Sequence, residues 1–149
     1  MPKNRKPGVK SFPVRVDYDT DLREAIAQAQ FDYADPEIVP TNFVSYQGGQ
    51  AEIETTLFRV EMEMTTNGIR ESLRRLGLRP AYLKEAVASI KTYPSTKNYV
   101  SIAVIGSKWV SRNKHQVAHI RLSGKEKRIH LSNTETTWPA GWYVIAVKR

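Results

Sequence analysis

The fold is decided by residues Leu73–Val110, which read LRRLGLRPAYLKEAVASIKTYPSTKNYVSIAVIGSKWV. Within this stretch, Tyr99–Ile105 is the most apolar run of the chain. Its apolar residues fall at both odd and even positions, which is the pattern of a strand covered on both faces. Gly106 then predicts a bend before Trp109. We therefore expect Tyr99–Ile105 to be the central strand of a sheet.

Two short helices are expected before this strand. Ile69, Leu73 and Leu76 have the i, i+4, i+7 spacing that places apolar side chains on one face of a helix. Gly77 supplies a left-handed stop at the end of that helix. Pro80 suits the first turn of a second helix, because the N–H that it lacks would have no partner there. The stretch is thus interpreted as a scaffold and not as an active site.

The composition is that of one ordinary globular domain. The chain has 149 residues, of which 40% are hydrophobic and 26% charged, so it can bury a real core. We expect residues 1–10, which are basic and almost without apolar side chains, to be a flexible arm, and residues 11–149 to form the domain. Cysteine is absent, which excludes disulfides and thiolate metal sites. No signal-like or membrane-spanning segment occurs, so a cytoplasmic protein without membrane contact is expected.

The charge is distributed unevenly along the chain. The net charge is +8, but residues 11–63 carry a balance of −8, whereas residues 64–149 carry +12 and residues 1–10 hold four bases. A basic half of this kind indicates an anionic partner, and nucleic acid is the commonest one.

Further strands are predicted on both sides of the central stretch. Ala51–Met64 has the alternation of a strand, but its apolar positions change phase, so we predict a β-bulge or a strong twist at Leu57-Phe58. Downstream, Gln116–Leu122 and Lys127–Leu131 form a hairpin, and Trp142–Val147 forms a last strand. The expected fold is α+β, a single domain with a mostly antiparallel sheet of five or six strands and about three helices.

The hairpin has an informative register. If the inward side chain of Ile120 faces that of Ile129, the same register places Arg121 opposite Arg128 on the other face. His119 is then opposite His130 on that face. Like charges that face each other destabilise a sheet, so these pairs indicate either full solvation or an anion that relieves the repulsion.

We therefore assign nucleic-acid binding, to RNA or DNA, to this surface and the amino-terminal arm. The assigned residues are Lys114, His119, Arg121, Lys125, Lys127, Arg128, His130, Trp138 and Trp142. The cations would follow a phosphate backbone, and the tryptophans would stack on bases. A charged face that only protects the sheet from aggregation is the competing interpretation, and it stays open.

Several motifs have the form of a known group of proteins. They are Asp17-Tyr18, Phe31-Asp32-Tyr33, Leu76-Gly77-Leu78-Arg79-Pro80-Ala81 and Ile105-Gly106-Ser107 before Trp109. Over nearly the whole chain, they resemble a group of short, uncharacterised bacterial proteins. The resemblance implies a single domain and brings no activity, cofactor or catalytic residue. The basic arm and hairpin depart from the more neutral or acidic members, so a function of the basic surface would be particular to this branch.

Other chemistries are less well supported by the sequence. The chain has no glycine-rich phosphate loop, nucleophile elbow or paired acid–base motif. His115, His119 and His130 could offer nitrogens to zinc, but bases surround them and no carboxylate is placed behind them, so we expect no metal or cofactor.

Two alternatives to simple nucleic-acid binding stay open. One is a protein-interaction or inhibitor module that binds a large protein or ribonucleoprotein, and a mobile element would be one source of such a module. The other is a small metal-independent ribonuclease of the toxin type, in which His119 and His130 would transfer protons.

Overall fold

The computed structural model describes residues 10–93, 96–111, 114–134 and 137–149. Its helices are α1 (Leu22–Ala29), α2 (Thr66–Arg75) and α3 (Leu83–Lys91). Its strands are β1 (Lys10–Asp17), β2 (Tyr33–Ala34), β3 (Gln50–Arg59), β4 (Leu78–Pro80), β5 (Thr96–Ser111), β6 (Lys114–Gly124), β7 (Glu126–Asn133) and β8 (Tyr143–Lys148). The expected basic arm falls on residues 1–9, which lie outside the described residues, and on Lys10, which begins β1.

The strands form one mixed sheet in the order β1-β3-β8-β5-β6-β7-β2, with β4 paired to β8 beside this path. The α+β class and the three helices are as predicted. The predicted number of strands, five or six in a mostly antiparallel sheet, is wrong, because the sheet is mixed and has eight. The two unforeseen strands, β2 and β4, have two and three residues, too few for any periodicity. Two pairs of neighbouring strands are parallel, β5 with β8 and β2 with β7, and neither is a pair of consecutive strands.

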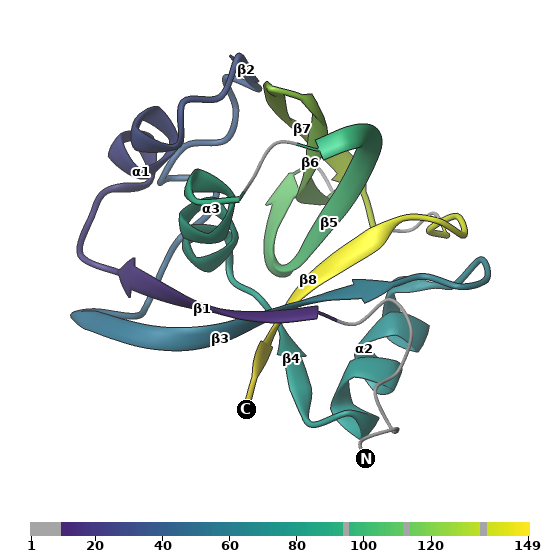
Figure 1. Ribbon diagram of the computed structural model, residues 1–149. Coiled ribbons are helices and arrows are strands. Elements are labelled where there is room, and N and C mark those ends of the chain that lie inside the picture. The colour runs from purple at the N-terminus through teal and green to yellow at the C-terminus, as the bar shows by residue number, and fades with distance from the viewer. Residues whose placement is uncertain (1–9, 94–95, 112–113, 135–136) are drawn as a thin grey trace.

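The sheet is covered differently on its two faces (Figure 1). Helices α1 and α3 pack on one face, which we call the inner face, and α2 lies on the opposite, outer face. Alternate residues of β5 confirm that both faces are covered, because Ile102 and Val104 join the inner core whereas Ala103 and Ile105 join the outer one. Helix α2 covers only part of the outer face, and on β6 and β7 the outward residues Arg121, Arg128 and His130 stay partly exposed.

Strand β1 forms one edge of the sheet, and Pro13 protects it. The backbone N–H of Tyr18 donates to the carbonyl of Gly49. The backbone N–H and C=O groups of even-numbered residues of β1 therefore bond to β3, and those of odd-numbered residues face the free edge of the sheet. Pro13 has no backbone N–H, and its nitrogen faces this free edge. The sheet therefore loses no hydrogen bond, and the edge has one donor fewer for pairing with another chain.

The irregular strand pairing lies in β5 and not in β3. The predicted bulge at Leu57-Phe58 is wrong, since β3 pairs with β1 and β8 in one continuous register and ends at Arg59, whereas the alternative of a strong twist there stays a prediction. The register shift occurs between Val104 and Trp109 of β5, where Gly106 lies against the backbone of Ala81. A Cβ at position 106 would lie 2.1 Å from the Ala81 carbonyl oxygen, so only glycine permits this approach.

The second predicted helix begins later than its sequence indicates. Pro80 is the last residue of β4, and α3 starts at Leu83 after the N-cap Tyr82. Pairing of β4 with β8 explains the difference, because tertiary hydrogen bonds outweigh the local preference of Pro80 for a first helical turn. The first helix ends as predicted, with Gly77 at a φ of 76°.

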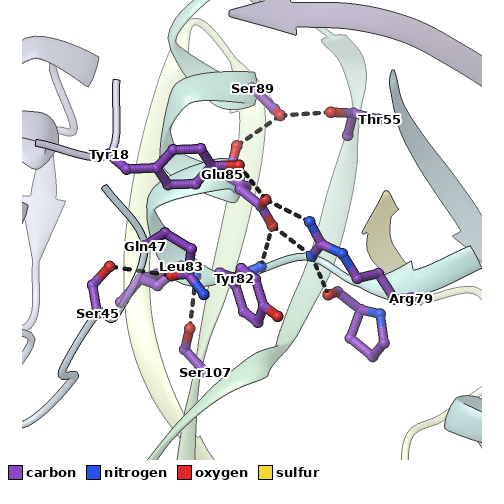
Figure 2. Close-up of polar contacts among 11 residues, drawn as sticks. Tyr18, Ser45, Gln47, Thr55, Arg79, Tyr82, Leu83, Glu85, Ser89 and Ser107 are labelled. Carbon is purple, nitrogen blue, oxygen red and sulfur yellow. Dashed lines mark hydrogen bonds and ion pairs between the residues drawn. The ribbon is translucent and has the colours of Figure 1, made fainter. Parts of the chain in front are cut away.

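A buried carboxylate joins these elements (Figure 2). Glu85 of α3 is 0% exposed, and Arg79 of β4 donates to its two oxygens at 2.9 and 2.7 Å. The hydroxyl of Tyr18 and the backbone N–H of Tyr82 donate to the same carboxylate at 2.6 and 2.7 Å. Burial, and then the hydrogen bond to Glu85, raise the pKa of Tyr18 above its usual range, so it stays a donor.

Substitution of Gly106 by alanine tests the close contact with Ala81. The added Cβ would overlap backbone atoms that cannot move aside, so we expect a loss of about 1–3 kcal/mol or more in the free energy of unfolding. Urea denaturation measures it. Gly48→Ala is the matched control, since its Cβ would lie 3.5 Å from the Asp19 carboxylate, an ordinary contact, and equal losses at both sites would contradict the contact.

Glu85→Gln tests the buried ion pair at nearly constant side-chain volume. Arg79 would keep its charge in a partly buried site without a counter-ion, so we expect the free energy of unfolding to fall by about 3–5 kcal/mol. The control is Glu71→Gln, which breaks the exposed pair with Arg74 and should cost at most about 1 kcal/mol. A loss at Glu85 no larger than at Glu71 would show that the buried pair contributes little.

Candidate nucleic-acid interface

The hairpin of β6 and β7 has the register that its sequence predicts. His119 pairs with His130 and Arg121 with Arg128, while Ile120 opposite Ile129 faces the inner core. Strand alternation thus brings two basic pairs together on the open part of the outer face. The stacked rings of His119 and His130 have centroids 5.3 Å apart, which confirms their shared face.

Tyr33 of β2 adds an aromatic ring beside the hairpin. It pairs with Arg128 in parallel register, and the Arg128 guanidinium lies 4.9 Å from the centroid of the Tyr33 ring. The ring is also 5.1 Å from that of His130. Sequence reasoning missed Tyr33, because nothing in a two-residue strand almost a hundred positions upstream indicates that it joins β7.

Tyr99 of β5 has the same relation to the other arginine. The Arg121 guanidinium lies 5.6 Å from the centroid of the Tyr99 ring, and Tyr99 is 57% exposed. The sequence analysis used Tyr99 only as the start of the central strand. We call Tyr33, Tyr99, His119, Arg121, Arg128 and His130 the outer-face cluster.

His119 is the buried member of this cluster, and it forms hydrogen bonds through both ring nitrogens. It is 6% exposed, its Nδ1 lies 2.6 Å from the hydroxyl of Ser132, and its Nε2 accepts a hydrogen bond from Nε of Arg121 at 3.0 Å. An Nε2 that accepts must be unprotonated, so the ring is neutral with its proton on Nδ1. Burial, followed by the charge of Arg121, lowers the pKa of His119 to about 4.

The two arginines are oriented but weakly neutralised. Arg121 is held by His119 and Tyr99, and within the described part of the chain no carboxylate forms an ion pair with it. Arg128 reaches Glu126 at only 3.9 Å, in an exposed pair. The guanidiniums are thus cations in adjacent strands whose repulsion a bound anion would relieve.

The other assigned residues are placed unequally. Lys114 is exposed at the start of β6 and Lys125 in the turn that follows β6, and Trp142 is half-buried with its ring centroid 5.2 Å from that of His119. Trp138 is 2% exposed and packs in the outer core, so its ring has no face for a base. Lys127 points to the inner face, where its ammonium donates to carbonyls that end α1 and α3, and it is not part of the outer surface.

His119 is poorly placed for proton transfer. Both ring nitrogens of His119 are engaged within the protein, so neither is free to accept a proton from a substrate. Burial, and then Arg121 and Arg128, lower the pKa of the half-buried His130. Among the described residues, no group of three or more His, Cys, Asp or Glu side chains could hold a metal ion.

Comparison with known proteins gives no precedent for this arrangement. No protein-family model, curated protein or solved structure matches the chain. None of the described helices is both long and apolar enough to cross a membrane. The outer-face cluster therefore has to be interpreted from its own geometry.

Acid should destabilise the protein through His119. The unfolded side chain has a pKa of about 6.5 and the folded one of about 4, so the unfolded state binds more protons between these values. The free energy of unfolding should therefore fall by about 1.4 kcal/mol per pH unit as the pH drops through this window. His119→Gln keeps an acceptor for Arg121 but does not titrate. Measured by urea denaturation, its free energy of unfolding should therefore fall below that of the natural protein by less at pH 4.5 than at pH 7. Parallel pH profiles would contradict the buried neutral ring.

Proposed function

We propose that the protein binds single-stranded nucleic acid, without catalysis, through the outer-face cluster. The observation that carries the proposal is the pairing of Arg121 with Arg128 across the hairpin, each with its guanidinium over a tyrosine ring. Fixed guanidiniums bind phosphate oxygens in bidentate geometry, and nearby aromatic rings stack on bases.

The shape of the surface favours a single strand over a duplex. The face is an open part of a sheet, and rings such as Tyr99 can stack only on bases that are not already stacked within a helix. Lys114 and Lys125, exposed beyond the cluster, would extend the positive path. The four bases of residues 1–10 would add contacts to phosphates without base selectivity.

His119 has a positioning role in this proposal. It fixes the Nε edge of Arg121 and leaves the terminal nitrogens of that guanidinium for an anion. Because its ring is neutral near pH 7, it adds no repulsion to the cluster. Binding energy would then come from the arginines and the tyrosines, and the histidine would set their geometry.

Salt dependence is the first test of phosphate binding. The variant with Arg121→Ala and Arg128→Ala should lose two phosphate contacts, so the slope of log K against log salt should decrease by about 1.4 for single strands. Fluorescence anisotropy with labelled RNA and DNA oligonucleotides measures the slope. The control, Arg23→Ala with Lys91→Ala, removes the same charge from exposed positions on α1 and α3.

Three results of this experiment would contradict the proposal. Absence of binding to any oligonucleotide at low salt would reject it, and a protein partner would become the better interpretation. An equal loss in the control variant would show that only net charge acts. RNA cleavage in the presence of a chelator would favour the ribonuclease alternative.

Tyr99→Ala tests base stacking separately from charge. Loss of one stacked base should weaken binding to single strands by about 1–3 kcal/mol while the salt slope stays unchanged. Tyr99→Phe is the control, because it keeps the ring that would stack on a base and removes only the hydroxyl. If both variants bind as the natural protein does, Tyr99 makes no contact with a base.

A further inference from the structure

A second candidate site lies on the inner side of the sheet. A cavity of about 230 Å³ opens between the loop of residues 43–47, the first turn of α3 and the bent part of β5. Its aromatic walls are Phe43, Tyr46 and Tyr82, and its basic groups are Lys84 and Lys108. None of the outer-face cluster lines it, so it is independent of the proposed nucleic-acid surface.

One wall of this cavity is held rigid by the buried network. Figure 2 shows Tyr82 with Arg79 on one side and the cavity residues Ser107, Ser45 and Gln47 on the other. The Arg79 guanidinium lies 4.4 Å from the centroid of the Tyr82 ring, and Glu85 accepts from the Tyr82 backbone. A binding wall fixed by such supporting contacts loses little entropy when a ligand arrives.

The adjoining residues are fixed in the same way. The backbone N–H of Leu83 donates to the hydroxyl of Ser107 at 2.8 Å, which ties α3 to the bend in β5. The ammonium of Lys84 donates to the carbonyl of Tyr18 at 2.9 Å and keeps two further N–H groups. The opposite rim is open, because Val44 is 57% exposed and Tyr46 is 89% exposed.

The lining defines the chemistry of a ligand. Two cations and no acidic residue line the cavity, so a negative group is favoured there. Phe43, Tyr46 and Tyr82 offer ring surfaces that favour a flat apolar group. The volume is below the roughly 300–1,000 Å³ typical of sites for drug-sized molecules, so the ligand must be small.

We propose that this cavity binds a small aromatic anion, a single ring system that carries one phosphate or carboxylate. The ring packs between Tyr82 and Tyr46, and the anionic group lies toward Lys84 and Lys108. The exposed side chains of Val44 and Tyr46 cover the ring when the site is occupied, which removes apolar surface from water.

Titration of the full chain with three probes, followed by NMR of backbone amides, tests this site. Phenyl phosphate should shift the signals of residues 43–47, 82–84 and 106–108 in a saturable manner. Inorganic phosphate, which lacks the ring, and phenol, which lacks the charge, should each bind at least about tenfold more weakly, since each loses one of two contacts. Benzoate in place of phenyl phosphate then distinguishes a carboxylate ligand from a phosphate ligand.

Two exposed positions supply variants that should fold normally. Lys108→Ala should weaken phenyl phosphate binding by about tenfold, as expected for one charge-assisted hydrogen bond, and Tyr46→Ala should weaken it by a similar factor. Lys148→Ala, an exposed lysine at the end of β8, is the charge control. No shift at these residues with phenyl phosphate, inorganic phosphate that binds equally well, or an equal effect of Lys148→Ala would each overturn the proposal.

Discussion

The rest of the structure depends on the buried carboxylate of Glu85. Its four donors come from β4, from the N-cap of α3 and from Tyr18 just after β1, so one side chain fixes three elements relative to one another. A charge that is 0% exposed is tolerable only when every oxygen is paired, which makes the arrangement of these elements specific. The same contacts orient Tyr82, so the network also shapes the cavity beside it.

A second constraint is the close backbone approach at Gly106. Through this contact, β5 lies directly against Ala81, the residue that follows β4. The pairing of β5 with β6 shifts register in the same part of β5. The hairpin of β6 and β7 pairs with β5 on both sides of this shift, because Ser101 before it pairs with Arg121 and Trp109 after it pairs with Gln116. Arg121 in turn pairs with Arg128 of β7, which places the two arginines on neighbouring strands.

The sequence predicted the parts of the candidate site that strand periodicity controls. Alternation within β6 and β7 was enough to pair His119 with His130 and Arg121 with Arg128, as the structure confirms. It was also enough to place Lys127 with Ile129 on the inner face, although the assignment of Lys127 to the basic surface overlooked this parity. The burial of Trp138 had no such signal, because its position depends on the bridge to Met64.

By itself, the sequence determined the α+β class, the helix that Gly77 ends and the register of the hairpin, since these follow from local conformational preference and from the period of apolar residues. Only the tertiary structure decided the parallel pairs, strand β4 at Pro80, and the arrival of Tyr33 beside Arg128. It also decided that His119 is buried and neutral. The physical reason is that these features arise from hydrogen bonds and packing between segments far apart in the chain, and no local pattern records which distant segment becomes the neighbour.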